Sequence, residues 1–181
     1  FELYPDATVL IDLQTGLPEA FNQVAHEQLG YSAREFSCLR ISDYEARESP
    51  AEIEKHIEYI KKHGRDDFET GHRRKDESII DVHVTVMLFE IKNKGFLLGV
   101  FRDITDRKSR KRKLETLNSQ YQTLVENFPN GAIFLYDRNL RAVRAGGSEL
   151  SEVGLSPEEI EGSTVQDRYP PDIAEELVHN I

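Results

Sequence analysis

Short apolar runs, and one long stretch in which apolar and polar residues alternate, predict β-strands in the first part of the chain. The clearest stretch runs from Ile80 to Leu88, where Val82, Val84 and Val86 share one predicted face. Turn-forming residues, among them glycine and asparagine, separate the stretches. The predicted strands cover residues 9–12, 18–21, 68–74, 80–88 and 96–104.

Helical signals lie between the second and third predicted strands. Asn22 is a suitable N-cap for a helical stretch that ends at Gly30. A longer helix begins at Pro50 and ends at Gly64. Its apolar stripe consists of Ile53, Ile57 and Ile60. Helices that lie between two blocks of antiparallel strands predict an α+β fold.

A weak repeat at a spacing of 124 residues indicates two copies of one unit. The identical pairs are Glu2/Glu126, Pro5/Pro129, Gly30/Gly154, Ser32/Ser156 and Glu35/Glu159. The second copy ends at Ile181, which corresponds to Ile57, so we expect a fragment of a longer protein with an incomplete second unit. The predicted divisions are a domain over 1–105, a linker helix over 106–124 and a partial second domain over 125–181.

The linker helix carries an apolar seam with alternating steps of three and four residues, which is the spacing of a coiled coil. The seam consists of Leu114, Leu117, Tyr121 and Leu124. We therefore predict a homodimer that forms through this helix and through surfaces of the preceding domain. Six of the seven residues over 107–113 are basic, and we interpret this run as a solvated helix face.

Composition narrows the functional classes. The net charge of −10 over 181 residues argues against a nucleic-acid partner. A single cysteine, Cys38, excludes an internal disulfide framework and fits a reducing compartment, so we expect a cytoplasmic location. No apolar stretch approaches the roughly 18 residues of a membrane span.

Several of these segments together resemble a PAS domain with its C-terminal PAC portion. The matching features are Asn22, Gly30-Tyr31-Ser32, Glu35-Phe36, the charged hairpin Arg73-Arg74-Lys75-Asp76, and Phe101-Arg102-Asp103-Ile104-Thr105 before a charged helix. The second copy is similar to the N-terminal half of such a domain. The whole chain thus resembles the tandem PAS region of a prokaryotic sensor histidine kinase or a related signalling protein.

The resemblance implies a five-stranded antiparallel sheet with short helices on one face and a ligand cleft between the two. It also implies that the signal leaves through the helix after the last strand, with Asn22, Asp103, Ile104 and Thr105 as relay residues. We expect Thr105 to cap that helix and Asp103 to pair with a nearby arginine.

His56 is the candidate cofactor ligand. It flanks the apolar stripe of the 50–63 helix, and this helix carries the axial histidine in the haem-binding PAS domains that the segment resembles. The alternative interpretation is a partly exposed histidine on a charged helix. Cys38 does not match the flavin-reactive cysteine of PAS photosensors, because that position falls on Ile41.

The remaining titratable residues form no recognisable catalytic or metal motif. His83 is expected to point away from the core, and His72 is expected to face Asp81 across a hairpin. We expect no metal site and no enzymatic activity in this segment.

Three functional hypotheses follow. The first is a sensory module that detects a small ligand or a partner and relays the change to an output or kinase domain of the same protein. The second is a haem sensor with His56 as the axial ligand, and the third is a dimerisation scaffold without a ligand.

Overall fold

The computed structural model describes residues 4–152, 154–171 and 173–175. The chain forms two compact units, Phe1–Lys111 and Arg112–Ile181. The boundary between them lies inside the helix that the sequence assigns to the linker. Each unit is described by itself below.

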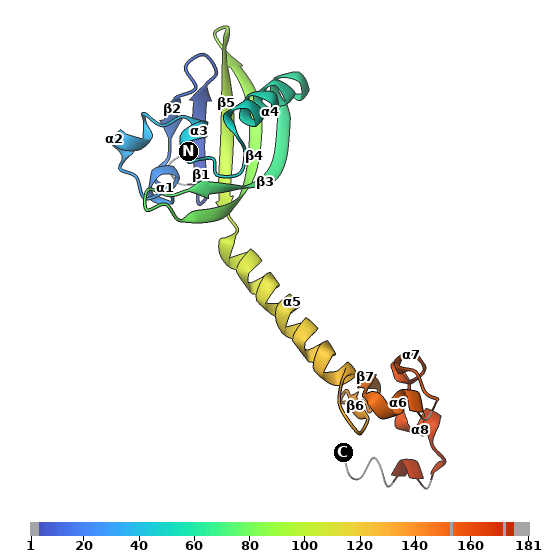
Figure 1. Ribbon diagram of the computed structural model, residues 1–181. Coiled ribbons are helices and arrows are strands. Elements are labelled where there is room, and N and C mark those ends of the chain that lie inside the picture. The colour runs from blue at the N-terminus through green and yellow to red at the C-terminus, as the bar shows by residue number, and fades with distance from the viewer. Residues whose placement is uncertain (1–3, 153, 172, 176–181) are drawn as a thin grey trace. The chain divides into compact units, whose positions relative to one another are not determined.

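Unit 1 is built on a five-stranded antiparallel sheet (Figure 1). The strand order is β2-β1-β5-β4-β3. This confirms the predicted α+β fold with a PAS-like sheet. The strands are β1 (Ala7–Asp12), β2 (Pro18–Phe21), β3 (Arg65–Arg73), β4 (Ile79–Ile91) and β5 (Lys94–Asp103).

Four helices lie between β2 and β3 in the sequence and pack on one face of the sheet. They are α1 (Gln23–Glu27), α2 (Ala33–Phe36), α3 (Ile41–Tyr44) and α4 (Pro50–His63). Their ends follow local sequence signals, because Ser32 and Glu35 form a capping box and Gly64 ends α4 in the left-handed region. The first helix is shorter than expected, since α1 ends at Glu27.

The core lies between this face of the sheet and the helices. Alternate residues of β4, which include Val82, Val84 and Val86, point into it, as the period of two in the sequence predicts. The helices contribute large buried side chains, among them Phe36 and Tyr44.

The β4–β5 hairpin turns earlier than the sequence predicts. Lys92 and Asn93 have positive φ angles of 51° and 62°, which two-residue turns of type I′ require. β5 therefore begins at Lys94 rather than at residue 96.

Asn22 ties the first strand to the first helix. Its side-chain oxygen accepts hydrogen bonds from the N–H groups of Thr8 (2.9 Å) and Ala25 (3.1 Å). Its amide nitrogen donates to the carbonyl oxygens of Tyr4 (3.2 Å) and Asp6 (2.9 Å). The fully buried amide thus uses both its donor and acceptor groups to hold this corner of the domain.

The last strand continues into α5 (Thr105–Glu126). The start of this helix differs from the expectation for Thr105. The Asp103 carboxylate accepts a hydrogen bond from the Thr105 N–H at 2.8 Å, so Asp103 rather than Thr105 acts as the cap. The Thr105 hydroxyl instead accepts a hydrogen bond from the backbone N–H of Asp81 at 2.9 Å.

Unit 2 repeats the order of the first five elements of unit 1. Its elements are β6 (Ile133–Tyr136), β7 (Ala142–Gly146), α6 (Ser148–Glu152), α7 (Pro157–Ile160) and α8 (Val165–Arg168). Ser156 and Glu159 form the capping box that Ser32 and Glu35 form in unit 1. The counterpart of Asn22 at the start of α6 is Gly147, where a Cβ atom would lie 2.3 Å from the Gly131 carbonyl oxygen.

No helix among the described residues is long and apolar enough to cross a membrane.

We predict that Asn22→Ala lowers the free energy of unfolding of unit 1 by about 2 to 4 kcal/mol, because it removes a helix cap and leaves buried backbone groups without partners. Urea unfolding followed by NMR signals of β1 and α1 measures this loss. Glu19→Ala, at an exposed position of β2, is the control and is expected to change the value by less than about 0.5 kcal/mol. Equal effects of the two substitutions would contradict the assigned role of Asn22.

Candidate functional site

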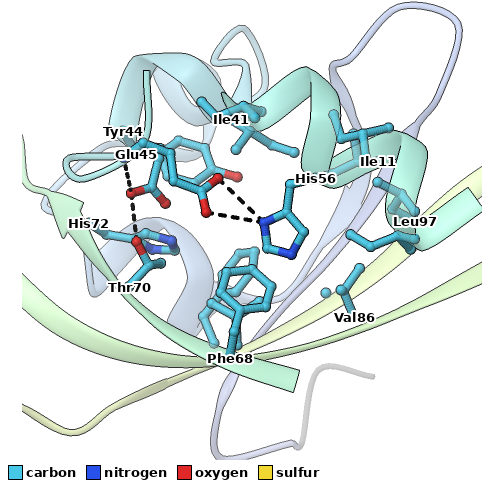
Figure 2. A pocket seen from close by; sticks show the side chains of 17 residues that line it. Ile11, Ile41, Tyr44, Glu45, His56, Phe68, Thr70, His72, Val86 and Leu97 are labelled. Atoms are coloured by element: carbon cyan, nitrogen blue, oxygen red, sulfur yellow. Dashed lines mark hydrogen bonds and ion pairs between the residues drawn. The ribbon is translucent and has the colours of Figure 1, made fainter. Parts of the chain in front are cut away.

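A cavity of about 60 Å³ lies between the sheet and the helices α3 and α4 (Figure 2). Its wall is mostly apolar. The apolar lining residues come from four strands and both helices, and include Ile11, Ile41, Ile57, Phe68, Val86, Leu97 and Phe101. This volume has room for roughly four to six water molecules.

His72 of β3 lines the cavity and is 2% exposed. Its ring contacts two aromatic rings edge to face, with centroid distances of 5.0 Å to Tyr44 and 4.9 Å to Phe101. Burial lowers the pKa of His72 to about 3, so the imidazole is neutral at physiological pH. Its Nδ1 atom has no hydrogen-bond partner among the described residues.

Glu45 and Glu48 line the cavity from the loop between α3 and α4. The Thr70 hydroxyl donates to Glu45 at 2.7 Å, and the same oxygen accepts from the Arg47 N–H at 2.8 Å. The loop also pairs with β3, because the Ala46 N–H donates to the Gly71 carbonyl oxygen at 2.8 Å. The wall of the cavity thus includes a loop that hydrogen bonds attach to the edge strand of the sheet.

His56 reaches the cavity from α4, as the sequence predicts, but both of its ring nitrogens are engaged. Nδ1 lies 3.1 Å from a Glu48 oxygen, and Nε2 lies 2.8 Å from an Asp66 oxygen. An axial bond to haem iron needs a free ring nitrogen, and a porphyrin needs far more than 60 Å³. The geometry of these residues therefore does not fit a haem on His56.

Among the described residues, no group of three or more histidine, cysteine, aspartate or glutamate side chains is arranged to hold a metal ion. Cys38 is exposed and is not among the residues that line the cavity.

The side chain of Arg47 passes around the edge of the sheet. Strand alternation places Thr70 and His72 on the cavity face, and Gly71 and its register partner Asp81 on the opposite face. Arg47 forms an ion pair with Asp81. Gly71 makes this path available, since a Cβ atom there would lie 2.8 Å from the Arg47 Nε atom.

Asp81 connects Arg47 to the start of α5. Lys108 of α5 lies 3.2 Å from Asp81 and 2.7 Å from Glu69. Burial raises the pKa of the Asp81 carboxyl, but the hydrogen bonds from Arg47 and Lys108 outweigh burial and hold the pKa below its ordinary value. The backbone N–H of Asp81 also donates to the Thr105 hydroxyl. Asp81 is therefore a charged contact between the loop at residues 45–48 and the start of α5.

Comparison with protein families identifies the fold. The PAS domain model matches residues 5–106, more than half of the chain. The chain belongs to the PAS domain family.

Similar proteins include a sensor and several isolated PAS domains. The methyl sulfide methyltransferase-associated sensor of Methanosarcina acetivorans is 29% identical over 105 residues, which are 58% of this chain and 10% of that protein. The chain thus spans about a tenth of the length of this curated relative. These similarities support a sensory signalling module.

Solved structures share the PAS fold. The PAS domain of an HTR-like protein from Haloarcula marismortui is 25% identical, with a TM-score of 0.53 over 57% of this chain and 85% of that one. A PAS domain from Desulfitobacterium hafniense is 19% identical and shares the fold, with a TM-score of 0.52 over 56% of this chain and 95% of that one.

The PAS relay residues expected from the sequence lie in two places. Asp103, Ile104 and Thr105 lie together at the junction of β5 and α5, where Asp103 pairs with Arg74 at 3.5 Å and Ile104 is buried. Asn22 lies at the start of α1 and is not among the residues that line the cavity.

Sequence reasoning missed His72, Arg47 and Asp81 as parts of the PAS site. The expectation that His72 faces Asp81 is wrong, because His72 pairs with Ile80 and lies on the opposite face from Asp81. The sequence did offer two signals, Gly71 and Asp81. Both lie inside predicted strands, and neither glycine nor aspartate favours a strand interior.

We predict that His72 makes unit 1 less stable in acid. Below pH 6.5 the unfolded chain takes up a proton on this residue, whereas the folded domain does not do so until about pH 3. The free energy of unfolding should therefore fall with decreasing pH, by up to about 1.4 kcal/mol per pH unit from this residue. Urea unfolding between pH 7 and pH 5 should give a shallower dependence for His72→Leu than for the unchanged protein. Parallel curves would refute the buried neutral histidine.

Proposed function

We propose that unit 1 senses a small ligand or a partner in its cavity and relays the change through α5 to an output domain elsewhere in the parent protein. We propose a prokaryotic histidine kinase or a related signalling protein as that parent. The segment itself is proposed to be a non-enzymatic module. Membership of the PAS family and similarity to a sensor protein support this assignment.

The path from Glu45 through Arg47 to Asp81 is the observation that carries the proposal. Glu45 holds the loop through Thr70 and through the Arg47 backbone, and the Arg47 side chain reaches the carboxylate beside α5. A ligand that moves Glu45 therefore also displaces Arg47. Loss of the Arg47 contact leaves Asp81 with Lys108 and changes how the first turn of α5 is held.

The relay requires two arrangements of the 45–48 loop with similar free energies. Polar contacts at the edge strand suit this role, because each one is modest and partly exposed to water. A ligand then favours one arrangement by its differential affinity for the two.

A dimerisation role is the second candidate function, and the exposed seam of α5 favours it. Leu114, Leu117, Tyr121 and Leu124 are 38% to 72% exposed. A helix that presents such a stripe to water is typical of a coiled-coil partner. We propose that a second copy of the chain covers the seam and that the dimer conveys the motion of α5.

We predict that Glu45→Ala speeds amide hydrogen exchange of residues 105–111 by about fivefold, because the loop no longer positions Arg47. The effect should disappear in an Arg47→Gln background, where the path is already broken. Hydrogen exchange followed by mass spectrometry or NMR measures both variants.

Glu54→Ala is the control for this experiment, since Glu54 is an exposed residue of α4. It is expected to leave the exchange of residues 105–111 unchanged. If Glu45→Ala alters exchange only near residues 45–72, the cavity is not coupled to α5 and the proposed relay is wrong.

We predict that Leu117→Glu weakens dimerisation by at least about tenfold, because it places a charge in the apolar seam. Asn118→Glu adds the same charge to an exposed neighbouring position and should leave the dimer intact. Analytical ultracentrifugation over a range of concentrations compares the two. A monomeric unchanged protein, or equal weakening by both substitutions, would count against the dimer.

A further inference from the structure

The two ring nitrogens of His56 join α4 to the 45–48 loop and to β3. Nδ1 lies 3.1 Å from a Glu48 oxygen of the loop, and dashed lines mark this contact in Figure 2. Nε2 lies 2.8 Å from an Asp66 oxygen of β3. The His56 ring also packs on Phe68 of the same strand, with 4.2 Å between the ring centroids. The imidazole thus holds a helix, a loop and an edge strand together at one point.

This pair of contacts requires a particular protonation state of the ring. A neutral imidazole carries one N–H group, so it donates to one carboxylate and turns a lone pair toward the other. An imidazolium carries two N–H groups and donates to both carboxylates. Hydrogen-bond distances from both nitrogens of His56 to carboxylate oxygens therefore fit the protonated ring.

Asp66 remains an anion throughout the range in which histidine side chains ordinarily change charge, about pH 5 to 8. Burial raises the pKa of the Asp66 carboxyl, but hydrogen bonds from His56 and from the Asp67 N–H outweigh burial and hold the pKa below its ordinary value. Arg65 and Asp67 flank Asp66 in the sequence, yet strand alternation places both on the opposite face of β3. A change of charge at His56 thus meets a constant negative charge on β3.

The other groups around His56 provide no competing cation. The residues that line the cavity from α3, β1, β4 and β5 carry no charged side chain, and the loop adds a second carboxylate, Glu45. His72 of β3 is neutral in this range, because burial lowers its pKa to about 3. On α4, Glu52 lies one turn before His56 but is bonded to Ser49, and Lys55 is exposed. The charge of the His56 ring is therefore the variable that decides whether Glu48 is held.

Loss of the ring proton leaves one N–H group for two carboxylates. Asp66 belongs to a strand whose position the ladder with β4 fixes, and its contact with His56 is the shorter of the two. Glu48 belongs to a loop. The neutral ring therefore keeps Asp66, and the lone pair on its other nitrogen repels the Glu48 carboxylate. The His56 side chain is 19% exposed, so its proton exchanges with water without unfolding of the domain.

We propose that His56 is a pH-dependent switch of the 45–48 loop, in which the protonated ring binds Glu48 to Asp66 and the deprotonated ring releases Glu48. This gives the module an input, the surrounding pH, that needs no molecule in the cavity. Arg47 adjoins Glu48 in the loop and pairs with Asp81, so release of Glu48 alters how Arg47 is held. The inference rests on the proposed relay only for its effect on α5.

A pH titration of the ¹⁵N-labelled whole chain by NMR between about pH 5 and 8 tests the switch. The ring nitrogen signals of His56 report its protonation, and the backbone N–H signals of residues 46–48 report the state of the loop. Both sets should move with one shared midpoint. The Ala46 N–H donates to the Gly71 carbonyl oxygen. Its protection from hydrogen exchange, taken relative to an unstructured chain at the same pH, should fall about fivefold as the ring loses its proton.

His56→Gln should abolish the pH dependence of the loop signals, because glutamine keeps a hydrogen-bonding group but does not titrate. His63→Gln is the matched control and should leave that dependence unchanged, since His63 is an exposed residue of the same helix. Should His56→Gln fail to fold, the midpoints measured on the unchanged protein still decide. A ring that keeps one charge over the whole range, loop signals that do not follow it, or loop signals that move equally in His56→Gln would overturn the proposal.

The same titration separates this inference from the relay. If the His56 ring and the loop titrate together but the protection of residues 105–111 does not change, the switch stands and the relay is wrong. If Glu45→Ala alters the exchange of residues 105–111 while the loop does not respond to the charge of His56, the relay stands and the switch is wrong.

Discussion

Alternation along the edge strand is the constraint on which this domain depends. Successive residues of β3 point to opposite faces of the sheet, so Thr70 and His72 face the cavity while Gly71 lies against the side chain of Arg47. A signal from the cavity must therefore travel along the strands or pass around the edge of the sheet. The absence of a side chain at Gly71 provides the second route, and the charge of Asp81 gives Arg47 a partner at its end.

The cavity and α5 are both attached to the same short loop, residues 45–48. Glu45 and Glu48 face the cavity, and Arg47 between them reaches Asp81 beside α5. This loop thus presents two acidic groups to the cavity and a cation to the opposite face of the sheet. Such a loop suits a switch, because its contacts are polar and individually weak.

Features that depend on neighbours in the sequence could be predicted well. Pro50, Gly64 and the Ser32–Glu35 pair define helix ends through contacts within a few residues, and the structure confirms each of them. The seam of α5 is likewise a local pattern. The PAS resemblance added a single five-stranded antiparallel sheet with helices on one face, which no local pattern determines.

The parts of the site that were missed depend on register and on distant partners. Arg47 and Asp81 are 34 residues apart, and only the pairing of Gly71 with Asp81 brings them together. A shift of one residue in the expected hairpin register placed His72 opposite Asp81 and so on the wrong face. Thr105 was expected to cap α5 for a related reason. Its hydroxyl bonds instead to the backbone N–H of Asp81 in β4, and this distant contact cannot be read from the local sequence.

The pairing of the loop with β3 also has a protective effect. β3 is the last strand of the sheet, and unpaired strand edges favour association with other chains. The Ala46 bond to Gly71 and the bridge between Glu45 and His72 cover part of that edge. Any movement of the loop large enough to break these bonds would expose a template for aggregation. Solubility thus limits the amplitude of the proposed switch and favours small shifts of side chains over opening of the loop.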